Sequence, residues 1–266
     1  MQFTYDHDLH VHSCRSTCSK DAGQTTEFLL QYALENRLST ICLTNHFWDE
    51  KLPCSDDWYR VQNLKHVTQD LPLPQAEGVR FLFGCETELD FRGTLGITRE
   101  NFDRFDFIAI PLTHFNKVGF VLTEEQASSA QNKARTWLER LSRVLSMDLP
   151  FAKTGLAHLA CPLISRYDRE EYLAVLDLLP QRDLDDLFSE VARLGIGVEI
   201  NTRDFFFSEE ETECVMRMFY TARECGCKFY LASDAHERDY FEKAKRSFAR
   251  AIALLDLQET DKFLLP

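Results

Sequence analysis

This chain of 266 residues lacks several features that would place it in a class at once. No apolar run reaches the roughly 18 residues that a membrane-spanning helix needs, and the N-terminus lacks the basic end and apolar middle of a signal peptide. Basic residues are the minority, 30 against 43 acidic ones, and the formal net charge is -13. We therefore expect a cytoplasmic protein with no membrane partner and no general affinity for long nucleic acid, whose backbone binds clustered Lys and Arg.

Three familiar catalytic signatures are also missing. The nine cysteines form no Cys-x-x-Cys pair, no Gly-rich dinucleotide fingerprint is present, and no Gly-x-Ser-x-Gly elbow marks a serine nucleophile. Most of the cysteines are expected to be small buried hydrophobes in a reducing compartment. An acidic chain can still bind an anionic substrate, because a local cluster of metal ions outweighs the global charge.

Apolar and polar segments alternate in a way that predicts an α/β fold. The chain can bury a full core, and we expect a single domain over residues 1–266. Strands are expected at 8–12, 39–44, 80–85, 105–112, 154–159, 196–201 and 228–232, and helices at 26–34, 56–69, 128–147, 169–179, 184–194, 210–225 and 243–256. About seven alternations, with polar residues after the strands, favour a closed β/α barrel over an open doubly wound sheet.

The segment Asp8-Leu9-His10-Val11-His12 carries the strongest functional signal. In an extended strand alternate side chains share a face, so the two imidazoles would point the same way. Two neutral nitrogen ligands at a fixed spacing suit zinc, iron or manganese. Six of the eight histidines lie at or just beyond the ends of expected strands: His10, His12, His46, His114, His158 and His236.

Six imidazoles and the carboxylates of Glu86 and Asp234 exceed what one tetrahedral ion needs. We expect two or three divalent ions, with Glu86 bridging neighbouring ions and offsetting their repulsion. A cluster of this kind binds phosphoryl oxygens, lowers the pKa of a bound water to about 7 and stabilises charge on the leaving oxygen. The residues expected to be essential for catalysis are His10, His12, Glu86 and Asp234.

Taken together and in this order, the motifs resemble the polymerase and histidinol phosphatase (PHP) family. The residues that carry the resemblance are Asp8-x-His10-x-His12, Thr44-Asn45-His46, Gly84-x-Glu86, His114, His158 and Ser233-Asp234-Ala235-His236. They span nearly the whole chain, and the ordered set is specific although no single motif is. The resemblance implies a distorted (β/α)7 barrel, similar to a TIM barrel, with a trinuclear site of zinc, iron or manganese and phosphoesterase activity.

The resemblance also implies a ligand set for each ion. The first ion would be held by His10, His12, Glu86 and Asp234, the second by Glu86, His114 and His158, and the third by His46 and His236. Cys18 stands where the family usually completes the third ion, and a thiolate suits zinc. Asp21 as that ligand, or a site with only two ions, are the open alternatives.

Two positions depart from the family pattern without removing a ligand. Asn45 stands where the family has Asp, so an acidic partner becomes an amide that still accepts a hydrogen bond but adds no charge. Leu159 replaces a Pro that often follows the histidine at position 158. Asp8 is expected to orient His10 or a loop rather than to bind metal.

Substrate contacts are predicted from position alone. Arg15, after the histidine pair, and Arg203, after the strand at 196–201, are candidates for a phosphate clamp because the planar guanidinium matches two phosphate oxygens. Either could instead form an exposed ion pair. The three phenylalanines at 205–207 could form a substrate wall or pack in the core, and Glu88 could support a ligand or face solvent.

We therefore expect a metal-dependent phosphoesterase that uses a metal-activated hydroxide, and the resemblance to the family implies a small phosphomonoester such as histidinol phosphate as its substrate. The alternatives are a phosphodiesterase acting on nucleotides or short oligonucleotides, an amidohydrolase-type enzyme that cleaves C–N bonds, and a non-catalytic metal-stabilised module. Amidohydrolase barrels share the opening His-x-His. The sequence leaves the substrate, the native metal and the oligomeric state open.

Overall fold

The computed structural model describes all 266 residues and has a mixed α/β fold in which neighbouring strands pair in parallel. One sheet has three strands in the order β1-β2-β4, and the other has six in the order β3-β5-β6-β7-β8-β9. The strands are β1 (His7–Val11), β2 (Thr40–Leu43), β3 (His46–Phe47), β4 (Arg80–Phe83), β5 (Cys85–Thr87), β6 (Ile108–Pro111), β7 (Thr154–Ala157), β8 (Gly197–Asn201) and β9 (Lys228–Ala232). The expected α/β fold with parallel strands is confirmed.

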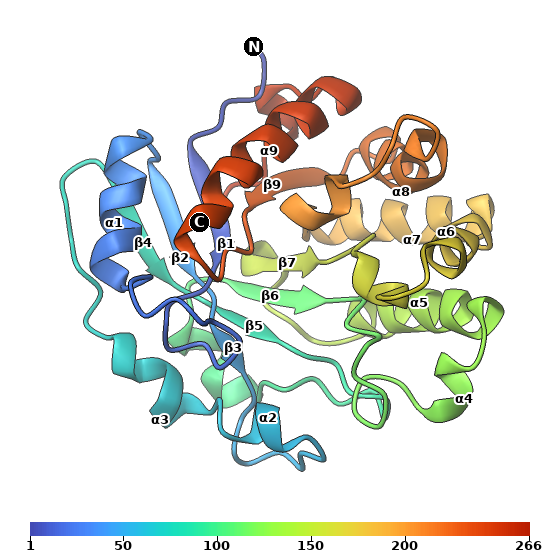
Figure 1. Cartoon of the computed structure of the whole chain (residues 1–266), viewed down its shortest axis with the longest axis horizontal. Helices are drawn as coiled ribbons and strands as arrows, with labels where there is room; N and C mark the ends of the chain where they lie inside the picture. Colours follow the sequence, from blue (N-terminus) through green and yellow to red (C-terminus); the bar gives the residue numbers. More distant parts are fainter.

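Short links join the two sheets. β2 passes into β3 through Thr44 and Asn45, and β4 passes into β5 through Gly84. A Cβ atom at Gly84 would lie 2.7 Å from the Phe107 carbonyl oxygen, so only glycine fits this crossing. At the far edges β1 and β9 lie side by side (Figure 1), with the Asp234 amide donating to the His10 carbonyl at 2.8 Å. The strand pairing defines two sheets and does not by itself define the expected closed barrel.

The helices lie outside the strands, with α4 to α8 grouped on one side of the molecule and α1 on another (Figure 1). Their bounds are α1 (Thr26–Glu35), α2 (Asp57–Arg60), α3 (Leu64–Val67), α4 (Glu124–Ala127), α5 (Ala130–Leu145), α6 (Arg169–Asp177), α7 (Gln181–Leu194), α8 (Thr212–Glu224) and α9 (Phe241–Leu255). The single helix expected at 56–69 is instead two short helices, because the side chains of Asp56 and Asn63 each cap a separate helix start. None of these helices has the length and apolarity needed to cross a bilayer.

Helix α5 packs its apolar face on the core and also braces the loops beside the strand ends. Trp137 is fully buried, and its indole N–H donates to the Leu159 carbonyl at 2.9 Å. Arg140 on the same face is only 4% exposed, and its guanidinium donates to the carbonyls of Leu112 and Leu89. A buried charge needs such partners to offset its lost hydration. Arg140 thereby fixes the segments that carry Glu88 and His114.

Candidate metal centre

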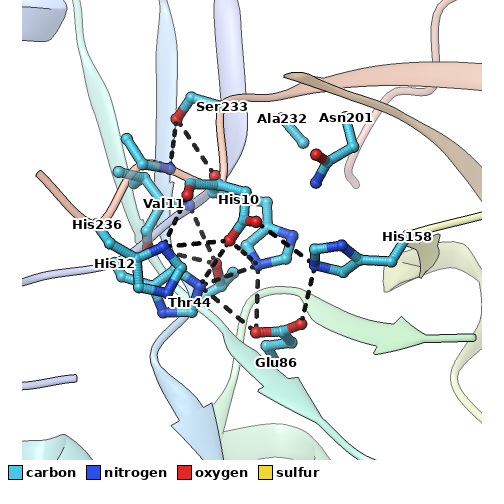
Figure 2. A network of polar contacts seen from close by, with 12 residues as sticks. His10, Val11, His12, Thr44, Glu86, His158, Asn201, Ala232, Ser233 and His236 are labelled. Atoms are coloured by element: carbon cyan, nitrogen blue, oxygen red, sulfur yellow. Dashed lines mark hydrogen bonds and ion pairs between the residues drawn. The ribbon is translucent and has the colours of Figure 1, made fainter. Parts of the chain in front are cut away.

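The side chains that the sequence singles out follow the carboxyl ends of the parallel strands, and Figure 2 shows His10, His12, Glu86, His158 and His236 close together there. Carboxyl ends of parallel strands lie at one edge of a sheet, which brings together residues that are far apart in the chain. Each residue is in a strand or shortly after one: His10 and His12 with β1, His46 with β3, Glu86 with β5, His114 with β6, His158 with β7, and Asp234 and His236 with β9.

Glu86 lies between two groups of imidazoles. Its Oε2 atom is 3.4 Å from Nε2 of both His10 and His12 and 2.8 Å from Nδ1 of His46. Its Oε1 atom is 3.3 Å from Nε2 of His158 and 3.7 Å from Nε2 of His114. The carboxylate is 1% exposed, and neither oxygen has a hydrogen-bond partner in the chain. Buried oxygens without partners are costly, and a cation on each side would satisfy both of them.

Asp234 is the second carboxylate in contact with the imidazoles of this cluster. Its Oδ1 atom lies 3.2 Å from Nε2 of His12 and 3.5 Å from Nδ1 of His236, while Oδ2 lies 3.7 Å from Nε2 of His158. Asp234 and His158 also have φ values of 53° and 55°, in the left-handed region that residues other than glycine rarely adopt. Backbone strain of this kind is often concentrated at functional sites.

Three groups of side chains are close enough to share an ion. The first is His10 with His12 and Asp234, the second is His10 with Glu86 and His158, and the third is Cys18 with His12, His46 and His236; within each group the potential ligand atoms lie within 4.8 Å of one another. The structure therefore places Cys18, and not Asp21, in the third group. Asp21 instead pairs with Arg238 at 2.8 Å. His114 stays outside these groups and approaches the centre through its contact with Glu86.

Hydrogen bonds on the Nδ1 side fix the tautomers of three of these histidines. A carboxylate can only accept, so Nδ1–H of His10 donates to Glu199 at 2.6 Å and Nδ1–H of His114 donates to Glu88 at 2.8 Å. Nδ1 of His236 lies 2.8 Å from the Asp234 carbonyl oxygen. In each case the lone pair on Nε2 is left for a metal ion, which is the usual arrangement of histidine ligands.

For Cys18, His46 and Glu86, the charges of neighbouring residues shift the pKa in the direction opposite to burial, and their effect is the larger one. Burial alone would raise the pKa of the Cys18 thiol, but the imidazoles of His46 and His236 lower it to about 5. Burial would lower the pKa of His46, but Glu86 and Cys18 raise it to about 10. The pKa of Glu86 lies well below its usual range because His46 and His10 outweigh its desolvation. The negative field that attracts protons to these imidazoles also suits divalent cations, so the residues present fit a metal cluster.

A cavity of about 570 Å³ opens over the cluster and shows which candidate substrate residues face it. Arg203 lines this cavity, with its Nε atom 3.7 Å from Asp234. Arg15 does not line it, and its guanidinium pairs with Asp70 at 3.1 Å, which is the exposed ion pair that the sequence left as the alternative to a clamp. Phe205 and Phe207 are buried in the core, which is the second of the two alternatives for these phenylalanines, and none of the three lines the cavity.

Several expected supporting contacts are found, but one important contact was missed. Asp8 accepts from the amides of His10 and Ser233, as expected for an orienting residue. Asn45 accepts from the amide of Ser13 rather than supporting a ligand directly. The missed residue is Glu199, fully buried in β8 and bonded to His10. Its signal in the sequence was an acidic residue inside the apolar run at 196–201.

Comparison with known proteins finds a solved phosphatase of similar fold. No family profile matches the chain, and a search of curated protein sequences finds no significant match. The structure matches the histidinol phosphate phosphatase of Lactococcus lactis subsp. lactis, solved in complex with zinc, L-histidinol and phosphate, with a TM-score of 0.64. The match covers 97% of this chain and 98% of that one, at 18% sequence identity. The resemblance stated from the motifs is supported, and at this identity the likeness establishes the fold.

Proposed function

We propose that this protein is a metal-dependent phosphoesterase that hydrolyses a small phosphomonoester. One observation carries the proposal: eight potential ligands, drawn from most of the length of the chain, lie in overlapping groups that include the buried carboxylates of Glu86 and Asp234. The likeness of the fold to a phosphatase solved with zinc and phosphate supports the same reaction class. Histidinol phosphate is the first candidate substrate through that likeness alone, which is a weak basis for function.

In this proposal the chain holds two or three divalent ions. His10, His12, Glu86 and Asp234 would hold the first, Glu86, His114 and His158 the second, and Cys18, His46 and His236 the third. Divalent ions in such a cluster activate water for attack on phosphorus and neutralise charge on the leaving oxygen. Zinc, iron and manganese all suit these ligands, and the thiolate of Cys18 favours zinc.

Residues of the chain would position the substrate and orient the histidines that bind the metal ions. Arg203 faces the cavity next to Asp234, where its guanidinium could bind a phosphate oxygen on the far side from the cluster. Glu199 and Glu88 would hold His10 and His114 in the tautomer that presents Nε2. We also propose that the two sheets act as one distorted (β/α)7 barrel, which the β1–β9 contacts support. A cytoplasmic location and a single domain remain predictions from the sequence.

Two measurements test this function. Elemental analysis of the purified protein should give two or three transition-metal ions per chain, and zero or one would contradict the cluster. The metal-loaded protein should hydrolyse p-nitrophenyl phosphate and leave p-nitroacetanilide intact. The reverse preference would favour the amidohydrolase-type alternative, since the two probes release chromophores from a P–O and a C–N bond. No hydrolysis of either probe, nor of a broad phosphoester panel, would favour the non-catalytic alternative.

A further inference from the structure

The cavity above the cluster has a charge that is opposite to that of the whole protein. The chain carries a net charge of -13, yet five basic side chains line this cavity against two acidic ones, Asp234 and Glu237. The five basic residues are Lys20, Lys117, Arg166, Arg203 and Lys243. A cleft lined by one sign of charge raises the local concentration of ligands of the opposite sign.

These five cations come from different parts of the fold. Lys20 follows β1, Lys117 follows β6, Arg166 follows β7, Arg203 follows β8 and Lys243 lies in the first turn of α9, beyond β9. Loops after the strands of a β/α fold are the usual place for substrate contacts. Because the five residues come from separate segments, the basic lining does not depend on a single charged stretch of the chain.

Three of the five cations have no acidic partner in the chain. Lys117 pairs with Asp56 at 3.2 Å and lies over the Trp58 ring, and Arg203 reaches Asp234. Lys20, Arg166 and Lys243 form no ion pair, although all three line the cavity. Their charges are therefore free to bind a group on the ligand.

The basic groups extend outward from the cluster. The guanidinium of Arg203 is 5.9 Å from the centroid of the Tyr240 ring, and the ammonium of Lys243 is 5.7 Å from the same centroid. Arg203 is half-buried beside Asp234, whereas the three cations without an acidic partner are exposed, so Arg203 lies at the inner end of the basic lining and the other three lie toward solvent. A phosphate held at the cluster would leave the other end of a short substrate next to Lys243 and the remaining unpaired cations.

We propose that the substrate is a phosphomonoester whose alcohol portion carries a second anionic group, a phosphate or a carboxylate, bound by Lys20, Arg166 and Lys243. This inference rests on the proposed function and names its substrate class. It also disfavours a cationic alcohol: histidinol carries an amine that is protonated at neutral pH, and the cavity offers Glu237 as its only acidic residue besides Asp234.

A matched set of four butyl phosphates tests the charge preference. The probes carry at the fourth carbon a hydroxyl, an amine, a carboxylate or a second phosphate, and kcat/KM is measured for each on the metal-loaded protein. We expect the carboxylate and the bisphosphate to exceed the hydroxyl compound by roughly tenfold, after correction for the two equivalent esters of the bisphosphate, and the amine to fall below it. A preference for only one of the two anions identifies which group the cavity binds. An amine that equals or exceeds both anions would overturn the inference.

Charge-removing variants locate the effect. Replacing Lys20, Arg166 and Lys243 together with glutamine should bring the ratio of anionic to hydroxyl substrate close to one, and added salt should lower the ratio in the unmodified protein because exposed charges are screened. Arg182→Gln is the matched control, since that arginine is 92% exposed on α7 and does not line the cavity. A triple variant with the ratio of the unmodified protein would overturn the inference while leaving the proposed function intact. If none of the four probes is hydrolysed, the proposed function fails first and the inference with it.

Discussion

Replacing Glu199 with glutamine tests whether this residue orients the histidine ligands of the candidate metal centre. Glu199 is fully buried, and its two oxygens have different tasks: Oε1 accepts from Nδ1 of His10, and Oε2 accepts from the backbone amide of His158. Both distances are 2.6 Å. Glutamine has the same shape but only one accepting oxygen. One of the two donors must therefore face the amide NH2 group.

Either orientation of the introduced side-chain amide weakens the centre. If the amide oxygen stays on the His158 amide, the NH2 group faces Nδ1 of His10, which must then give up its proton and carry it on Nε2, where no metal can bind. If the oxygen stays on His10, the backbone amide of His158 loses its acceptor. Outer partners of metal ligands contribute roughly 10- to 100-fold in metal affinity, or about 1.4 to 2.7 kcal/mol. We expect E199Q to bind zinc more weakly by this factor.

Competition with a chromophoric chelator measures the loss, and ¹⁵N chemical shifts of the His10 ring report its tautomer directly. Glu139→Gln is the control, because Glu139 is 58% exposed on α5 and pairs only with Arg135. An E199Q protein that binds zinc as tightly as the control, with His10 still protonated on Nδ1, would refute the tautomer argument.

Three further predictions concern the reaction, the third ion and acid stability. Asp234→Asn should lower kcat on p-nitrophenyl phosphate by several orders of magnitude while circular dichroism shows an intact fold; turnover equal to that of the unmodified protein would remove the metal mechanism. Cys18→Ala should lower the metal content by about one ion per chain, measured by elemental analysis, and an unchanged content would remove the thiolate from the site. Partial burial would raise the pKa of Asp6, but hydrogen bonds from His7 and Lys262 lower it to about 2. Its stabilisation is therefore complete above the usual value near 3.8 and disappears as the pH falls through 2. Since Asp6 is 35% exposed, we expect Asp6→Asn to lower the free energy of unfolding of the metal-free protein by about 1 kcal/mol at pH 7 and by less at pH 3, and a loss that grew with acid would contradict the ion pair.

The strand positions and the convergence of the ligands could be predicted because both depend on strong local patterns. Apolar runs ending in His46, Glu86 or Asp234 mark strands whose ends carry polar groups, and parallel pairing then brings those ends together. The same reasoning predicted α5 over 128–147, where the structure has Ala130–Leu145. Long periodic segments average out the uncertainty of any single position.

Contacts that depend on the reach of long side chains could not be predicted in this way. Arg15 and Arg203 occupy equivalent places after their strands, yet Arg15 turns to Asp70 and Arg203 turns to the cavity. No sequence motif marks the basic lining that includes Lys20 and Lys243, since these residues are far apart in the chain and meet only through the tertiary fold. The break between α2 and α3 was missed because Asn63 was not recognised as a cap, although capping asparagines have a known preference.

The contact between β1 and β9 has a consequence for how this protein is made. The ribosome produces His10 and His12 more than 200 residues before Asp234 and His236. The backbone bond from Asp234 to His10 can form only after that last strand has left the exit tunnel. A nascent chain therefore exposes an incomplete set of imidazoles until that strand has emerged, and the complete centre can bind cations only after this point.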